Sequence, residues 1–137
     1  MSYLLDSNVV SELRKHERAN AGVRQWFAGV DDTELFLSVL TVGELRRGID
    51  SIHRRNRTRA LALNRWFRAL VIEYEARILS VDQKVAEEWG RMNAVRTLPA
   101  VDSLLAATAH VHGLIFVTRN TKDVAHTGVP CLNPFTQ

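Results

Sequence analysis

The sequence predicts an α/β protein built on a central parallel β-sheet with helices on both faces. Short apolar runs of strand length alternate with longer segments whose apolar residues recur at helical spacing. Alternation of this kind is typical of parallel sheets whose crossover helices cover both sides. No internal repeat and no linker rich in proline or glycine divides the chain, so we expect a single domain over residues 1–137.

The first elements are short and are separated by polar turns. The apolar run that begins at Tyr3 stops at Asp6, and Gly29 closes a short helix in the manner of a helix C-terminus. The expected elements are a strand at Tyr3–Leu5, helices at Val9–Arg14 and Gly22–Phe27, and a second strand at Leu35–Ser38.

A longer helical region follows the second strand. Thr41 and Glu44 have the spacing of a capping box, which predicts that the helix begins at Thr41. Val42, Leu45 and Ile49 then share one face. The segment from Arg46 to Arg68 carries eight arginines and one acid. Its second half has an apolar stripe at helical spacing, made of Leu61, Leu63, Trp66, Phe67 and Leu70.

The second half of the chain repeats the alternation of strand and helix. Asp82 is a favoured residue for a helix N-cap, Pro99 interrupts the chain, and Gly113 is placed to end a buried, alanine-rich helix. The expected elements are a strand at Ile78–Leu79, helices from Asp82 to about Arg96 and over Asp102–His112, a strand at Leu114–Val117, and an edge strand at Val129–Leu132.

Composition excludes several classes of protein. Apolar residues make up 46% of the chain and charged residues 24%, a balance typical of a folded globule rather than a disordered chain. The lone Cys131 cannot form an internal disulfide, and no Cys/His group has zinc spacing. The N-terminus lacks the pattern of a signal peptide, and no apolar run could span a bilayer, so we expect a cytoplasmic protein without membrane contact. The net charge of +3 comes from fifteen arginines against three lysines, which favours an anionic partner.

Four acidic residues from distant segments are predicted to meet at one edge of the sheet. Asp6 directly follows the first strand, and Asp123 lies in the loop that leaves the fourth. Glu44 lies near the start of the helix after the second strand, and Asp102 opens the helix that leads to the fourth. All four positions belong to the carboxyl edge, where parallel α/β sheets bind their ligands.

A cluster of carboxylates at neutral pH indicates a divalent cation, because clustered negative charges raise one another's pKa unless a cation offsets them. Oxygen ligands favour Mg²⁺ or Mn²⁺ over zinc. Such an ion activates water and stabilises the charge that builds on a phosphate. Together with the basic composition, this arrangement predicts metal-dependent hydrolysis of phosphodiester bonds.

Each candidate residue also has a structural interpretation. Asp6 and Asp102 are favoured helix caps, the capping box by itself explains Glu44, and Asp123 fits a solvated loop. The arginine-rich segment fits either a solvated helix face or a track for nucleic-acid phosphates. The tryptophans Trp26, Trp66 and Trp89 are expected in the core and not as platforms for base stacking. Ser7 and Ser103 each follow a key aspartate and are candidates to orient water or phosphate.

The motifs around these acids resemble those of PIN-domain proteins, specifically the VapC toxins of type II toxin–antitoxin systems, with the FitB-like branch the most similar. The resemblance runs from Met1 to the C-terminal end. It is carried by the opening Leu4–Leu13, the second motif Leu37–Gly48, the third motif Asp102–Ala109, the fourth motif Val117–Asn120 with Asp123, and the ending Val129–Pro134.

The resemblance implies a PIN-like nuclease domain with a parallel sheet of about five strands and a Mg²⁺- or Mn²⁺-dependent ribonuclease activity. It also implies a homodimer that a small cognate antitoxin neutralises, with assembly on operator DNA as a further expectation. Carried over to this sequence, Asp6 and Asp102 are the metal ligands, Glu44 and Asp123 complete the catalytic set, and Ser7 and Asn120 are polar supports.

The function expected from these observations is that of a toxin endoribonuclease, whose metal-activated water cleaves RNA. Arg46, Arg47 and Arg119 are the candidate contacts for RNA phosphates. A second hypothesis is a weakly catalytic or non-catalytic partner in an antitoxin complex on operator DNA, with the acids as a docking pocket for a basic side chain. A third, an aspartyl-phosphate enzyme, expects an aspartate two residues after Asp6, where this chain has Asn8.

Overall fold

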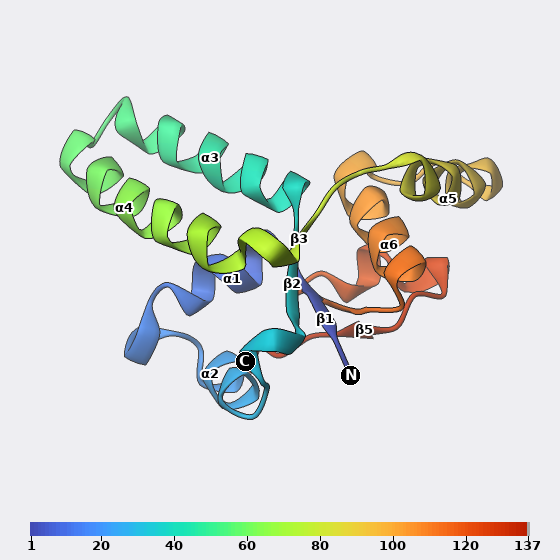
Figure 1. Cartoon of the computed structure of the whole chain (residues 1–137), viewed down its shortest axis with the longest axis horizontal. Coiled ribbons are helices and arrows are strands. Elements are labelled where there is room, and N and C mark those ends of the chain that lie inside the picture. The colour runs from blue at the N-terminus through green and yellow to red at the C-terminus, as the bar shows by residue number, and fades with distance from the viewer. Residues whose placement is uncertain (137) are drawn as a thin grey trace.

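A single sheet of five short parallel strands runs through the centre of the protein (Figure 1). The computed structural model describes residues 1–136. The strands lie in the order β3-β2-β1-β4-β5, so β1 is the middle strand and pairs with both β2 and β4. Their bounds are β1 Tyr3–Leu5, β2 Leu35–Ser38, β3 Ile78–Leu79, β4 Ile115–Val117 and β5 Cys131–Leu132. The predicted parallel sheet is confirmed, and the last strand lies at an edge as expected.

The described residues form six α-helices, which pack on the two faces of this sheet (Figure 1). Helices α3 and α4 form a long hairpin on the same side of the sheet as α1 and α2, and α5 and α6 pack against each other on the opposite side. Their bounds are α1 Ser7–Leu13, α2 Ala21–Ala28, α3 Val39–His53, α4 Arg57–Tyr74, α5 Gln83–Val95 and α6 Ala100–His112.

The alternation of side chains along the strands divides the core into two clusters. Leu4 and Phe116 face α6, whereas Leu5 and Val117 face the side of α1, α3 and α4. Each pair of neighbours in a strand points to opposite faces because the side-chain period of a β-strand is two. Both faces of β1 and β4 are buried, which explains why these strands are uniformly apolar rather than alternating with polar residues.

Several helix boundaries follow the local signals in the sequence. The Asp82 side chain accepts a hydrogen bond from the Val85 amide at the start of α5. Gly113 ends α6 with φ of 66°, a left-handed conformation that glycine adopts without steric cost. Gly29 follows the last residue of α2, with φ of −93° rather than a left-handed conformation.

The predicted capping box at Thr41 is wrong. Helix α3 begins at Val39, and the Ser38 hydroxyl caps it by accepting a hydrogen bond from the Leu40 amide at 3.0 Å. The chain therefore enters the helix directly from β2, and Thr41 is buried inside its first turn. Glu44 consequently lies one turn further into the helix than expected, too far from its start to act as a capping residue.

Two further expectations about helices need correction. Leu61 does not join the apolar stripe of α4, because its side chain is 48% exposed, while Leu63 and Phe67 are buried against α3 and the sheet. The last buried helix starts at Ala100, with Pro99 as its N-cap residue. Asp102 is therefore a residue of the first turn rather than the residue that opens the helix.

The end of the described chain packs across the start of α2. The Asn20 side chain caps α2 and also contacts Thr136, whose amide donates to Asn20 Oδ1 at 2.9 Å. Gly22 lies directly beneath this crossing, since a Cβ atom at that position would fall 2.4 Å from the Pro134 carbonyl oxygen. None of the helices within residues 1–136 has the length and apolar character that a membrane span requires.

Candidate active site

Asp6 is buried at the carboxyl end of β1, with only 5% of its surface exposed. Its backbone amide donates to the Val117 carbonyl of β4, which fixes the residue at the junction of the two strands. One carboxylate oxygen, Oδ1, accepts a hydrogen bond from the Ser7 amide at 2.7 Å and so caps α1. The structural and functional interpretations of Asp6 therefore apply together, because the cap orients the carboxylate.

Two polar residues that the sequence alone did not single out also hold Asp6. The Thr118 hydroxyl donates to Asp6 Oδ2 at 2.7 Å and accepts from the Asn120 amide at 3.1 Å. The Asn8 side-chain amide lies 3.4 Å from the same carboxylate oxygen, and its carbonyl oxygen accepts from the Arg119 amide. Thr118 immediately follows β4, just as Asp6 follows β1, and this shared position is the signal that identifies it.

Glu44 reaches the same edge of the sheet from the second turn of α3. Burial, the largest contribution, raises the pKa of its carboxyl group, and the charges of Asp6 and Asp102 raise it further. The Ser7 side chain and the charge of Arg47 act in the opposite direction. Its Oε1 atom is buried and has no hydrogen-bond partner among residues 1–136. A buried carboxylate oxygen without a partner is costly, so this atom is suited to receive a ligand.

Asp102 and Asp123 complete the acidic group from the other side of β1. Asp102 is half-buried in the first turn of α6, and Asp123 is exposed in the turn Thr121–Asp123 after β4. Burial raises the pKa of Asp102, and the charges of Asp6 and Asp123 raise it further. None of the ion pairs found within the described part of the chain involves Asp6, Glu44 or these two acids.

The strand ends and helices that carry the four predicted acids lie at one edge of the sheet, where the charge of Asp6 acts on both Glu44 and Asp102. The carboxylates do not form a ready-made metal site, because no three His, Cys, Asp or Glu side chains among residues 1–136 lie close enough together to hold an ion. The donor set is nonetheless composed of oxygen atoms and includes the unpartnered Glu44 Oε1. Among residues 1–136, no basic side chain forms an ion pair with it. Such a set fits a hard divalent cation that keeps several of its own waters, as Mg²⁺ does.

The other predicted residues surround this acidic group to different degrees. Ser7 adjoins Asp6 and Glu44, and Asn120 is exposed beside Thr118. Arg119 is exposed, and its guanidinium lies 4.8 Å from the Phe135 ring centroid. Ser103 is buried away from solvent and accepts a hydrogen bond from Trp89 Nε1, so its role is structural.

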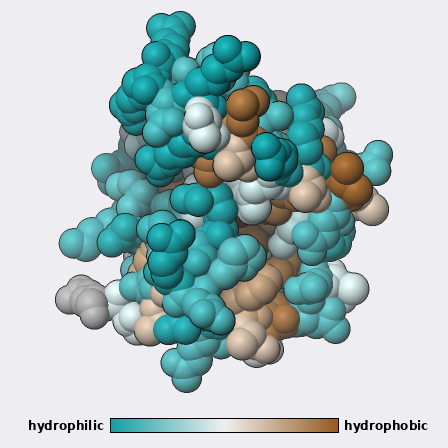
Figure 2. Space-filling model, turned by 90° about the vertical axis from the view of Figure 1, so that its left-hand side faces the viewer, coloured by the Kyte–Doolittle hydropathy of each residue, from teal (hydrophilic) through white to brown (hydrophobic). Residues whose placement is uncertain are grey.

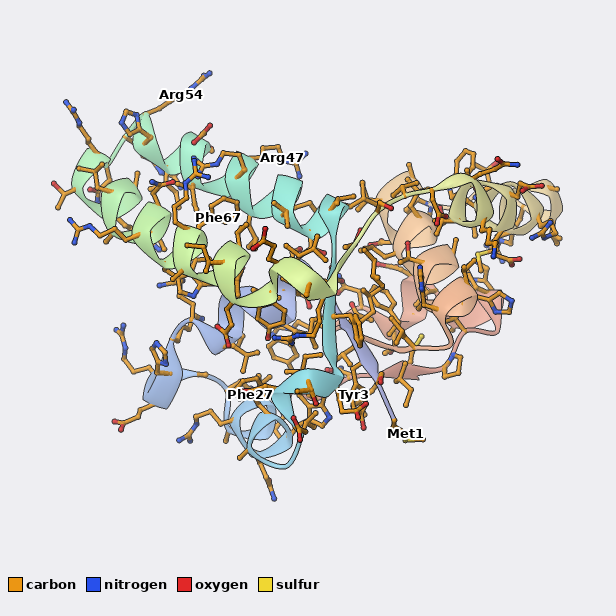
Figure 3. All side chains as sticks on the ribbon, in the orientation of Figure 1. Met1, Tyr3, Phe27, Arg47, Arg54 and Phe67 are labelled. Carbon is orange, nitrogen blue, oxygen red and sulfur yellow. The ribbon has the colours of Figure 1, made fainter. Side chains whose placement is uncertain are left out.

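The arginines of α3 differ in how much of their side chains is free. The Arg46 guanidinium donates to Asp50 at 2.9 Å, contacts Asn64 and lies 4.7 Å from the Phe67 ring centroid. These contacts tie Arg46 into the α3–α4 hairpin. Arg47 points outward from α3, and its charge acts on Glu44 (Figure 3). Arg47 is therefore better placed than Arg46 to contact a ligand at the acidic group.

An open cavity of about 280 Å³ adjoins the acidic group between α1, α3 and α4. Ser7 and Glu44 form the part of its wall nearest the acids, and Arg47 stands beside them. Further along, the wall is made of Leu45, Ile49, Leu63 and Trp66 together with Arg14 and Arg59. The acidic group thus opens into a space that is partly apolar and bordered by arginines.

The amino-acid sequence matches one protein family and several curated proteins. The family model described as "PIN domain" matches residues 3–128. "VapC ribonuclease Y4jK" of Sinorhizobium fredii is 31% identical over 96% of this chain and 96% of its own length. "Toxin FitB" of Neisseria gonorrhoeae is 29% identical over 96% of this chain and 97% of its own length.

Solved structures of similar sequence have the same fold as this chain. The FitAcB crystal structure from Neisseria gonorrhoeae superposes with a TM-score of 0.84 at 28% identity, covering 96% of this chain and 97% of the matched chain. The structure of FitAB bound to an IR36 DNA fragment gives 0.85 at 26% identity, covering 98% and 96% of the two chains.

Proposed function

The chain belongs to the PIN-domain family, and from that premise we propose that it is a divalent-metal-dependent endoribonuclease that acts as the toxin of a type II toxin–antitoxin pair. The similarity to the VapC and FitB toxins supports this role. The observation that carries the proposal is the position of four acids from separate segments at the carboxyl edge of the sheet, with the unpartnered Oε1 of Glu44 among them: Asp6, Glu44, Asp102 and Asp123.

Asp6 and Asp102 are the residues that would hold Mg²⁺ or Mn²⁺, with Glu44 and Asp123 in support. When bound, the ion lowers the pKa of a water molecule and offsets the negative charge that develops on the phosphate. Thr118 and the Ser7 amide keep the Asp6 carboxylate in one orientation. Glu44, whose carboxyl pKa is raised, is suited to take up a proton near the reacting phosphate.

The basic surface next to the acids supports RNA as the substrate. Arg47, whose charge acts on Glu44, and Arg119, which follows Thr118 in the chain, are the proposed phosphate contacts, with Ser7 and Asn120 as additional polar groups. At the far end of the hairpin, the connection between α3 and α4 carries further exposed arginines, among them Arg54 (Figure 3). Hydrophilic residues cover most of this end of the molecule (Figure 2). Phosphate contacts made there would give binding that weakens with salt.

Assembly with other chains is part of the same proposal. We propose a cognate antitoxin as the neutralising partner, a homodimer as the toxin's own state, and a larger assembly on operator DNA. The similar proteins solved as FitAcB, and as FitAB with a DNA fragment, support this expectation. The proposal places the protein and these partners in the cytoplasm.

A cleavage assay on the purified chain, free of any partner, tests the proposal. Single-stranded RNA labelled at one end should be cut with Mg²⁺ or Mn²⁺ and remain intact in EDTA. Asp102→Asn should abolish cleavage, whereas Glu17→Gln, a change at an exposed acid far from the site, should leave it unchanged. Mg²⁺ should also raise the melting temperature of the wild type but not of Asp102→Asn, because ligands stabilise the state that binds them. Cleavage that persists in EDTA, or in Asp102→Asn, contradicts the mechanism.

The alternative is a protein that acts mainly through its antitoxin complex on operator DNA. The similarity to a complex solved on DNA favours it, as does the lack of three converging ligand side chains within residues 1–136. Under this alternative the acids receive a basic side chain of the partner. The purified chain would then leave RNA intact with either metal, and the Asp102→Asn substitution would weaken partner binding instead.

A further inference from the structure

The cavity between α1, α3 and α4 begins where the acidic group ends. Glu44 belongs both to the acidic group and to the cavity wall, and Ser7, which adjoins Glu44, also lines the cavity. A molecule bound at the acids therefore lies next to the opening. Its volume of about 280 Å³ is at the lower end of the range for small-molecule sites. The space therefore suits one flat ring system rather than a helix or a duplex.

Trp66 in the wall of this cavity differs from the other two tryptophans. The Trp26 ring packs edge-to-face on Tyr3, with 5.3 Å between the ring centroids, and Trp89 donates to the Ser103 hydroxyl. These two side chains therefore serve the structure, as the sequence suggested. Trp66 packs on the core with part of its surface and presents the rest to the cavity, where it forms the apolar wall together with Leu63.

The positive charges around the cavity and its aromatic wall suit a nucleic acid, which carries anionic phosphates and flat bases. Arg14, Arg47 and Arg59 line the cavity, and the charge of Arg47 also acts on Glu44. Proteins that read single-stranded RNA splay out unpaired bases and stack them on aromatic rings or guanidinium planes. Phosphates on either side of an inserted base would be attracted to these arginines.

We propose that this cavity holds one unpaired base of the RNA, adjacent to the phosphate at the acids and stacked on Trp66. The inference rests on the proposed ribonuclease function and adds to it a requirement for single-stranded RNA with an unpaired base at one fixed position from the cut. Trp66 binds substrate in this arrangement, and Arg14 and Arg59 contact the base or its flanking phosphates.

Abasic substitution in the RNA tests the contact directly. A short single-stranded RNA with one cleavage site is made with a single abasic nucleotide at each position around the cut. For the wild type, one position should lower kcat/KM at least tenfold, equivalent to about 1.4 kcal/mol. Trp66→Ala should lower kcat/KM on intact RNA by a similar factor, and the abasic penalty at that position should disappear. Trp26→Ala, the matched control outside the cavity, should keep the full penalty.

A binding experiment separates this inference from the cleavage proposal. Asp102→Asn protein in EDTA is titrated with the same RNA, and tryptophan emission is recorded. Quenching that is lost with Trp66→Phe, a variant that retains an aromatic ring, supports a base on the Trp66 indole even if the wild type cuts no RNA. Melting temperatures of the variants verify that they are folded.

Two results would overturn the inference while leaving ribonuclease activity intact. An abasic penalty that persists in Trp66→Ala places the sensitive base elsewhere. If the wild type cuts every abasic RNA as fast as the intact RNA, the cavity holds no base. The cavity would then be a candidate contact site for a protein partner. If the wild type cuts no RNA, and if RNA also fails to quench Trp66, both the proposed function and this inference are wrong.

Discussion

Replacing Thr118 by valine removes the buried hydroxyl that donates to Asp6 and accepts from the Asn120 amide. Valine has nearly the shape of threonine, so the change removes the hydroxyl that donates to Asp6 Oδ2 at 2.7 Å without opening a cavity. Thr118 is 1% exposed, so water does not replace the lost donor. A hydrogen bond to a charged group contributes about 1.5–3 kcal/mol, which is the expected loss in free energy of unfolding.

The expected change in melting temperature follows from the size of the chain. An unfolding entropy of about 2.1 cal/mol/K per residue gives about 0.3 kcal/mol/K for a chain of 137 residues. The loss from Thr118→Val then corresponds to a melting temperature lowered by roughly 5–10 °C. Urea unfolding in EDTA measures the free energy without any contribution from metal binding. RNA cleavage by Thr118→Val should fall because the Asp6 carboxylate loses its fixed orientation.

A double-mutant cycle with Asp6→Ala decides whether the effect comes from this bond. If the interaction is as the structure shows, the cost of Thr118→Val in the Asp6→Ala background should shrink to what the lost Asn120 contact contributes. The difference between the two backgrounds gives a coupling of about 1.5–3 kcal/mol. Thr118→Ser keeps the hydroxyl and should keep cleavage. A coupling below about 0.5 kcal/mol, within the ordinary error of additivity, would refute the role assigned to Thr118.

Three other changes give distinct outcomes. Asp102→Asn should abolish RNA cleavage yet raise the free energy of unfolding at neutral pH, as measured by urea unfolding; a destabilised variant would contradict the electrostatic account. Gly22→Ala should lower the free energy of unfolding by about 1–3 kcal/mol because its Cβ meets the crossing chain, whereas Gly90→Ala, with open space around it, should not be destabilising. Arg46→Ala should lower the melting temperature. Arg47→Ala should lower RNA cleavage without a comparable change in melting temperature. If the two substitutions had identical effects, the different roles assigned to these arginines would be wrong.

The stabilisation expected from Asp102→Asn depends on pH in a defined direction. The folded-state pKa of Asp102 lies above its ordinary value of 3.8, so the folded state binds the proton more tightly than the unfolded chain does. Below pH 3.8 the group is protonated in both states and carries no penalty. As the pH rises through the folded pKa, the wild type loses stability that the asparagine variant keeps. The difference between the two proteins should therefore grow from acid to neutral pH in metal-free buffer.

The sequence predicts where the four acids lie in the fold, because each of them is close to a strand end or to the beginning of a helix. These acids are Asp6, Glu44, Asp102 and Asp123. Apolar runs marked the strands, and parallel strands bring their carboxyl ends to one edge. The sequence predicts too late a start for α3. Ser38 and Thr41 both carry a hydroxyl group that can cap a helix, and the local sequence pattern does not show which of them does so. The end of β2 decides between them, since the chain turns into the helix directly after Ser38.

Sequence alone therefore determined the class of fold and the acids at its carboxyl edge, because the periodicity of apolar residues and the chemistry of short polar turns act over a few neighbouring residues. Only the tertiary structure decided that Thr118 holds Asp6, since 112 residues separate them and the contact exists because β1 pairs with β4. It also decided that Trp66 lines a cavity beside Glu44, because the packing of α3 against α4 and α1 sets which part of the indole stays uncovered.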